Sequence, residues 1–240
     1  TVFFVREPLA PTAPAPWYGP CSAQPSLQPV RMPVYITGLG LATPATRYSK
    51  EECWLGFARS PWFSRLAPRS RALAEVVLTR DNGIETRHLA LDRLEDAFTI
   101  DPDTLHKRFC ENAPVLASRA AARALDRAAV EAAGVDAIVV STCTGYLCPG
   151  LSGYVAERLG LGARTAAFDL VGQGCGAAIP NLEMATSLVA SGRAENVLSI
   201  CVEVSSAAMY LDDDPGVLLS ACLFGDGAGA AVVSASEGEQ

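Results

Sequence analysis

The sequence predicts an α/β fold in which a mostly parallel sheet is flanked by helices. Apolar runs of strand length alternate with segments of helical periodicity through the middle of the chain, which is typical of βα units. The run at residues 135–142 is almost continuously apolar, as expected of a central strand in a parallel sheet. Half of the 240 residues are apolar, so the chain can bury a sizeable core.

The first half of the chain is expected to open with a strand at residues 34–41. Ser49 is a predicted helix N-cap, because acidic residues, including Glu52, follow in the first turn. Further elements are expected as a helix at 70–79, an extended piece at 84–89, and helices at 104–109 and 114–133. The last of these is expected to be a separate helix, since Pro114 suits a first turn and Gly134 suits a helix end.

The second half is expected to continue the alternation of helices and strands. Helices are predicted at 151–159, 177–190 and 217–223, and strands at 166–171, 196–204 and 228–234. Gly160 marks the end of the first of these helices. The strand at 166–171 is expected to be buried, because it is a run of mainly apolar residues.

Composition limits the domain organisation and the kinds of partner. Residues 1–32 are rich in proline and alanine and are predicted to form a flexible arm ahead of one domain at 33–240. The net charge of −7 argues against nucleic acid as the main partner. No apolar run approaches the roughly 18 residues of a membrane-spanning helix, so no membrane contact is expected. The sequence does not begin with Met, as expected of a processed chain or a fragment.

The cysteines are interpreted as reduced thiols in a cytoplasmic protein. There are eight, but the chain is too long and too apolar to need disulfides for stability. No C-x-x-C occurs and there are only two histidines, so no metal site is expected.

Cys175 is the strongest candidate for a reactive residue. It lies in a glycine-rich turn between the strand at 166–171 and the helix at 177–190. A helix N-terminus gathers unpaired N–H groups and is expected to lower the pKa of a thiol. The flanking glycines leave room for a substrate beside the sulfur. Cys175 is therefore either a nucleophile that carries an acyl group as a thioester or a small buried cysteine in a tight turn.

A local basic region lies in this otherwise acidic chain. Residues 59–93 contain seven arginines and only four acidic residues. Such a region could receive the phosphates of coenzyme A, or it could be a solvated surface, which the pattern alone favours.

Three motifs together resemble the type III polyketide synthases, the chalcone and stilbene synthase family of the thiolase superfamily. They are the loop at 142–150 (TCTGYLCPG), the turn at 172–178 (GQGCGAA) and the turn at 223–230 (LFGDGAGA). Each lies at a strand–helix junction or enters a strand, and the resemblance extends over about residues 34–235.

The resemblance implies a chemistry and a set of substrates. A starter acyl-CoA would load Cys175, and malonyl-CoA would lose carbon dioxide to give a carbanion. The carbanion would attack the thioester in a Claisen condensation, and repeated extension would end in cyclisation. No cofactor is implied beyond the coenzyme A thioesters that serve as substrates.

The resemblance also assigns positions in the site. Substrate-cavity positions fall on Cys143, Thr144, Cys148, Ser205, Ala208 and Phe224. Cys148 matches a residue that reaches into the neighbouring subunit's cavity, which implies a homodimer. Phe224 matches an aromatic gate, although a core aromatic beside a turn is an alternative. Arg80 and Arg87 lie where the family has cationic residues at the mouth of the coenzyme A tunnel.

The chain departs from the family in its oxyanion donors. Decarboxylation and condensation develop negative charge that needs positioned donors. The family supplies them with a His and an Asn from its second half, whereas this sequence ends at Gln240. His88 and His106 match neither position and are expected on the solvated surface. Asn181 is expected to be an ordinary helix residue, and Asp226 to bond backbone N–H groups in a turn.

The chain is therefore interpreted as the first of the two pseudo-symmetric halves of the thiolase fold. Without the second half, in cis or in trans, the helix at 177–190 would expose an apolar face formed by Ile179, Leu182, Ala185 and Leu188. Two alternatives stay open. One is a ketoacyl-ACP synthase III-like condensing enzyme, and the other is a non-catalytic half-fold protein that pairs with another subunit.

Overall fold

The computed structural model describes residues 33–237, so the predicted arm at 1–32 lies outside the described residues. The helices are α1 (Lys50–Arg59), α2 (Pro61–Arg65), α3 (Pro68–Thr79), α4 (Pro102–Ala128), α5 (Leu151–Leu159), α6 (Ala178–Ala190) and α7 (Pro215–Leu223). The strands are β1 (Tyr35–Ala42), β2 (Arg47–Ser49), β3 (Thr86–His88), β4 (Ala137–Thr142), β5 (Ala166–Val171), β6 (Asn196–Glu203) and β7 (Gly227–Ser234). The 3-10 turns are η1 (Leu94–Phe98), η2 (Ala132–Gly134), η3 (Gly174–Gly176) and η4 (Ser205–Ala207).

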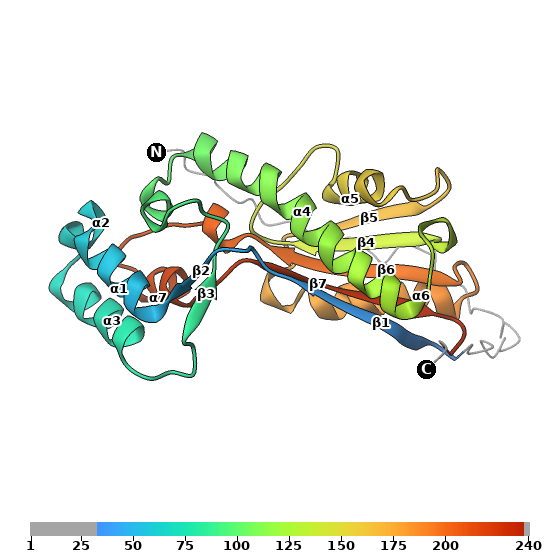
Figure 1. Cartoon of the computed structure of the whole chain (residues 1–240), viewed down its shortest axis with the longest axis horizontal. Coiled ribbons are helices and arrows are strands. Elements are labelled where there is room, and N and C mark those ends of the chain that lie inside the picture. The colour runs from blue at the N-terminus through green and yellow to red at the C-terminus, as the bar shows by residue number, and fades with distance from the viewer. Residues whose placement is uncertain (1–32, 238–240) are drawn as a thin grey trace, which may run out of the picture. The chain divides into compact units, whose positions relative to one another are not determined.

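Five strands form one mixed sheet in the order β1-β7-β6-β4-β5. β4 pairs in parallel with β5 and β6, whereas β7 pairs antiparallel with β6 and β1. Four strands therefore run in one direction and β7 runs in the other. The reason is that the connection through η4 and α7 stays beyond the end of β6, so the chain re-enters the sheet from that end (Figure 1). The α/β prediction is confirmed, with one reversed strand in the mostly parallel sheet.

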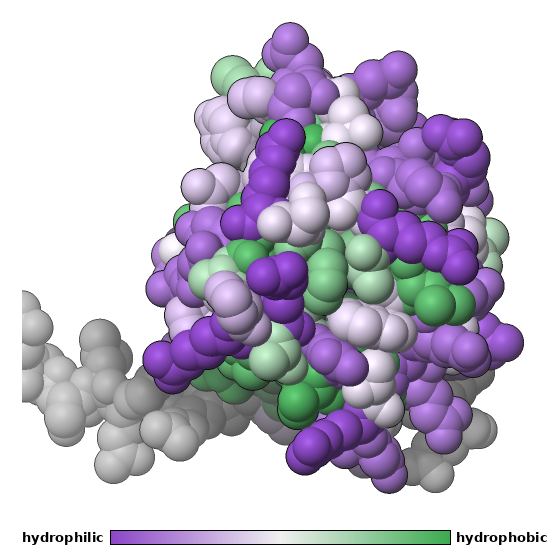
Figure 2. Space-filling view, turned by 90° about the vertical axis from the view of Figure 1, so that its left-hand side faces the viewer, coloured by the Kyte–Doolittle hydropathy of each residue, from purple (hydrophilic) through white to green (hydrophobic). Residues whose placement is uncertain are grey.

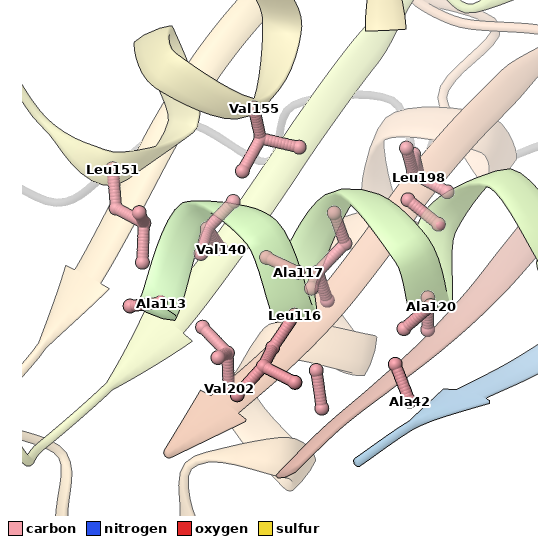
Figure 3. Close-up of a cluster of buried hydrophobic side chains, with 14 of the residues drawn as sticks. Ala42, Ala113, Leu116, Ala117, Ala120, Val140, Leu151, Val155, Leu198 and Val202 are labelled. Atoms are coloured by element: carbon pink, nitrogen blue, oxygen red, sulfur yellow. The ribbon is translucent and has the colours of Figure 1, made fainter. Parts of the chain in front are cut away.

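Helices α4 and α5 cover one face of the sheet and α6 packs on the other (Figure 1). The contact face of α4 is rich in alanine, and Figure 3 shows Ala113, Ala117 and Ala120 against the side chains of β4 and β6. β1 approaches α4 so closely that a Cβ atom at Gly40 would lie 2.0 Å from the carbonyl oxygen of Ala120. Small residues on both elements therefore set the distance between this helix and the sheet.

The prediction of two helices between residues 104 and 133 is wrong. α4 is one helix of 27 residues that contains Pro114 and is capped by the Asp101 side chain. Proline removes one backbone donor, but Phe109 and Ala117 on either side of it are fully buried on the same face. This continuous packing keeps the helix intact through Pro114. The helix ends at Ala128, and Ala132–Gly134 form the separate turn η2 instead of its last turn.

The expected burial of β5 and of α6 is only partly correct. None of the six residues of β5 is buried, because this strand lies at the edge of the sheet formed by residues 33–237 and pairs there with β4 alone. On α6, Ile179 is 69% exposed, and Leu182 and Leu188 are partly buried. Ala185, expected on the exposed face, is fully buried between α6 and the sheet.

Helices α1, α2 and α3 gather at one end of the unit and enclose an aromatic cluster that includes Phe57 and Phe98. Ser49 caps α1 and forms a capping box with Glu52, as predicted. Seen from this end, the surface is mostly hydrophilic, with small separate apolar patches (Figure 2). Arg65 stacks over Trp62 at 5.1 Å from the ring centre to the guanidinium carbon. The basic region of these helices therefore has the character of a solvated surface.

Candidate functional site

Cys175 lies at the turn that joins the edge strand β5 to α6. It is the central residue of η3, and the turn begins with left-handed backbone at Gly172 (φ 77°) and Gly174 (φ 70°). The N–H of Gly172 donates to the carbonyl of Thr142 at 3.1 Å, which attaches the turn to the end of β4. Cys175 itself is exposed, so the alternative of a buried cysteine does not hold. The strand–turn–helix setting expected for a nucleophile is present.

The loop that carries Cys143 and Thr144 lies next to this turn. β4 and β5 are parallel neighbours, and Thr142 and Val171 pair at their carboxyl ends, so the segments that follow leave the same edge of the sheet. Partial burial of the Cys143 sulfur, a hydrogen bond to Glu203, the charge of Glu203 and the proximity of Cys175 together raise the pKa of Cys143 to about 11. Two cysteines with different environments therefore share this site.

Glu203 is a site residue that the sequence analysis did not identify. Its carboxylate accepts hydrogen bonds from the backbone N–H groups of Cys143 and Thr144, each at 3.0 Å, and from the Thr142 hydroxyl at 3.3 Å. The Thr144 hydroxyl in turn accepts from the N–H of Val204 at 2.8 Å. The signal in the sequence was a single acidic residue at the carboxyl end of an apolar strand.

A cavity of about 430 Å³ gathers most of the predicted substrate positions. Its lining includes Arg87, Cys143, Thr144, Ser205, Ala208 and Phe224. Helix α7 contributes Val217 and Ser220, which the sequence analysis also missed. Phe224 is 49% exposed on the cavity wall, so it is not a core aromatic. Residues from four separate segments thus meet around one hollow, whose walls are mainly apolar.

Cys148 and Arg80 lie outside this cavity, and Arg87 lines it without a free guanidinium. Cys148 is exposed in the loop after β4, near Tyr146, which is 62% exposed. Arg80 is exposed at the end of α3. Arg87 lines the cavity but is only 8% exposed, and its guanidinium donates to the carbonyls of Phe224 and Ala221. This placement favours a role in holding the end of α7 over one as a free phosphate ligand.

Asn181 and Asp226 have structural roles, as predicted. Asn181 is fully buried, and its amide bonds the carbonyl of Ile200 at 2.9 Å and the hydroxyl of Ser199 at 2.7 Å. Asp226 is 4% exposed and accepts from the N–H of Ala90 at 2.6 Å and from the N–H of Ser206 at 2.8 Å. These bonds fix helix α6 and the turn at Ser205.

The two histidines have different environments. His106 is exposed on α4, with its Nε2 3.3 Å from the Cys110 sulfur, which confirms a surface position. His88 is partly buried, and its Nδ1 lies 2.8 Å from the carbonyl oxygen of Pro44, so the solvated position expected for it is wrong. The seven cysteines of the described segment are all free thiols. Within residues 33–237, no helix has the length and apolar character needed to span a membrane.

The sheet order, the turn at Cys175 and the cavity together define a protein of the thiolase fold. Polyketide synthase PKS-I from Ectocarpus siliculosus matches with a TM-score of 0.76 at 24% identity, over 86% of this chain and 56% of that one. The 1,3,6,8-tetrahydroxynaphthalene synthase of Streptomyces coelicolor A3(2), a bacterial type III polyketide synthase, matches with a TM-score of 0.71 at 26% identity, over 85% of this chain and 57% of that one. The predicted thiolase-like architecture is confirmed.

Sequence comparison identifies the family. Residues 95–240 match the model of the FAE1/Type III polyketide synthase-like proteins, and the chain belongs to this family. The alpha-pyrone synthesis polyketide synthase-like Pks18 of Mycobacterium tuberculosis is 34% identical over 160 residues, which are 64% of this chain and 41% of Pks18.

Two further relatives represent different activities. The 3,5-dihydroxyphenylacetyl-CoA synthase of Streptomyces toyocaensis is 29% identical over 209 residues, which are 85% of this chain and 50% of the relative. A beta-ketoacyl-[acyl-carrier-protein] synthase III of Campylobacter concisus is 37% identical over 163 residues, which are 67% of this chain and 42% of the relative. The chain thus spans about half the length, or less, of the curated relatives that it matches.

Proposed function

We propose that Cys175 is the acyl-accepting nucleophile of a type III polyketide synthase. Its thiolate attacks the carbonyl carbon of a starter acyl-CoA, a C–S bond forms, and coenzyme A leaves as its thiolate. The observation that carries this proposal is the exposed thiol of Cys175 in a strand–turn–helix junction, beside the loop at 142–144 that enters the cavity. Membership of the polyketide synthase family supports the same chemistry.

The later steps need groups beyond those on the described residues. Malonyl-CoA would lose carbon dioxide, and the resulting carbanion would attack the acyl-Cys175 thioester before further extension and cyclisation. Both steps develop oxyanions that positioned donors must stabilise. We assign those donors to a His and an Asn of a second α/β half, supplied in cis or in trans.

An exposed apolar face supports the requirement for a second half. On β1, Leu39 is 56% and Leu41 is 70% exposed, on the side of the strand opposite α4. On α6, Ile179 is 69% exposed. A soluble protein rarely leaves several large apolar side chains uncovered. A second half that packs on α6 would cover Ile179 and would complete the wall around Cys175.

A homodimer is the second part of the proposal. Among the described strands, β5 lies at the sheet edge and pairs with β4 alone, so its other side offers backbone donors and acceptors to a partner. The exposed loop with Cys148 follows the adjacent strand β4 and is positioned to reach a partner subunit. The cytoplasmic location inferred from the reduced cysteines is part of this proposal too.

The test is the mass of the intact protein after incubation with an acyl-CoA. We expect one acyl increment on the wild-type chain and none on Cys175→Ser, whereas Cys110→Ser should load like the wild type. With malonyl-CoA added, this chain alone should release no condensed product. A loaded Cys175→Ser variant would contradict the assignment, and turnover by the isolated chain would contradict the need for a second half.

Relatives among the beta-ketoacyl-ACP synthases III keep one alternative open. In that case the substrate that extends the acyl group would be a malonyl group on an acyl carrier protein in place of malonyl-CoA. Extension that requires a malonyl carrier protein, in the presence of the second half, would favour this alternative. A protein whose Cys175 does not load from any thioester would instead be the non-catalytic half-fold partner.

A further inference from the structure

The loop that holds Cys143 is fixed by a residue from a different strand. β4 and β6 are parallel neighbours, and Ser141 pairs with Cys201, so Glu203 lies level with Cys143 at the same edge of the sheet. Its two carboxylate oxygens receive the N–H of Cys143 at 3.0 and 3.1 Å and that of Thr144 at 3.0 Å. This single carboxylate therefore sets the path of the chain directly after β4.

The same carboxylate contributes to the protonation of Cys143. Partial burial of the sulfur is the largest cause of the raised pKa of Cys143, and the negative charge of the Glu203 carboxylate, which lies beside the residue on its backbone N–H, favours the neutral thiol further. The titratable groups that face Cys143 are Glu203 on β6 and Cys175 in η3, and both disfavour a second negative charge. A thiol with a pKa of about 11 is thiolate in only about one molecule in ten thousand at pH 7.

A second thiol beside Cys175 could remove the acyl group that Cys175 carries. A Cys143 thiolate could attack the carbonyl carbon of an acyl group on Cys175, form a new C–S bond and expel the Cys175 thiolate. The acyl group would then lie on the wrong residue, away from the nucleophile turn. The exchange needs no other reactant, so only the protonation and position of Cys143 can prevent it.

We propose that Glu203 is a positioning residue that holds Cys143 in the cavity wall as a neutral thiol, so that Cys175 alone accepts the acyl group. The carboxylate acts through the hydrogen bonds that it receives from the loop at 142–144 and does not itself contact the reacting atoms. This consequence for the acyl group rests on the proposed function of Cys175. The protonation of Cys143 does not rest on it and can be measured separately.

The test compares alkylation of individual cysteines by iodoacetamide as a function of pH, resolved by peptide mass spectrometry. In the wild type, labelling of Cys143 should rise only as pH approaches about 11, well above the value of about 8.5 for a free cysteine. In Glu203→Gln, which keeps an amide oxygen for the loop but removes the charge, labelling of Cys143 at pH 8.5 should increase about three- to tenfold.

Glu195→Gln is the matched control, because Glu195 is an exposed acid at the opposite end of β6. It should leave the labelling of Cys143 unchanged. An unchanged pH profile in Glu203→Gln, or an equal increase in Glu195→Gln, would overturn the proposal. If Glu203→Gln does not fold, the wild-type profile decides, since labelling of Cys143 with a midpoint near pH 8.5 would also overturn it.

Incubation with acyl-CoA separates this inference from the proposed function. We expect the acyl group on Cys175 alone in the wild type, and on both Cys175 and Cys143 in Glu203→Gln. If no cysteine loads in either protein, the proposed function fails while the alkylation profiles still report on Glu203. If Cys143 loads equally in both proteins, the role of Glu203 is wrong although Cys175 can still be the nucleophile.

Discussion

Asn181 offers a direct test of how helix α6, which follows the Cys175 turn, is attached to the sheet. Its side chain is fully buried between α6 and the sheet, where it donates to the carbonyl of Ile200 at 2.9 Å and accepts from the hydroxyl of Ser199 at 2.7 Å. Asn181→Ala leaves the Ser199 hydroxyl without its acceptor, which costs about 1–3 kcal/mol. The cavity adds roughly 1 kcal/mol, so we expect a loss of about 3 kcal/mol in the free energy of unfolding.

The assay is urea denaturation followed by circular dichroism, combined in a double-mutant cycle. Ser199→Ala removes the orphaned hydroxyl, so the double variant should be more stable than the sum of the single losses predicts, by about 1 kcal/mol. Ser187→Ala is the control, because its hydroxyl bonds only within the exposed side of α6 and its loss should cost little. A loss below about 1 kcal/mol for Asn181→Ala, or no coupling with Ser199, would refute the reasoning.

Two further substitutions test other parts of the structure. Gly40→Ala should cost about 3 kcal/mol or prevent folding, since the new methyl group would overlap the backbone of α4, whereas Gly229→Ala should cost little because its nearest neighbour would be a side-chain atom at 3.7 Å. Equal thermal unfolding of these two variants would contradict the close approach of β1 to α4. Asp226→Ala should cost about 3 kcal/mol or more, since it leaves buried N–H groups of Ala90 and Ser206 unpaired, and Asp226→Asn should recover part of that loss. Urea titrations that find both variants as stable as the wild type would contradict this role.

Hydrophobic periodicity predicted most helices and strands, because burial of one face of an element determines the spacing of its apolar residues. Cys175 was placed correctly, since its glycine-rich turn lies between a strand and a helix that each have an apolar face. The preference of proline for the first turn of a helix wrongly predicts a helix start at Pro114. Packing of the whole of α4 against the sheet outweighs this local preference. The exposure of β5 was missed, since an apolar run does not reveal whether its strand lies at the centre or the edge of a sheet.

The candidate site was predictable where it follows local motifs and not where it depends on strand order. Cys143 and Thr144 stand in a recognisable loop, and the structure places both in the cavity. Glu203 contacts them from about 60 positions further along the chain, through the pairing of β4 with β6. The family resemblance assigns Arg87 to a tunnel mouth, but its bonds to the end of α7 depend on a tertiary contact that the sequence does not reveal.

The most direct test of the account is to identify which cysteine carries the acyl group after incubation with an acyl-CoA at neutral pH. Proteolysis and peptide mass spectrometry should place the increment on the peptide that contains Cys175, with every other cysteine unmodified. The account predicts that Cys175→Ser removes this increment without moving it to Cys143. An acyl group on any other cysteine of the wild type, with Cys175 free, would contradict the central role of the turn between β5 and α6.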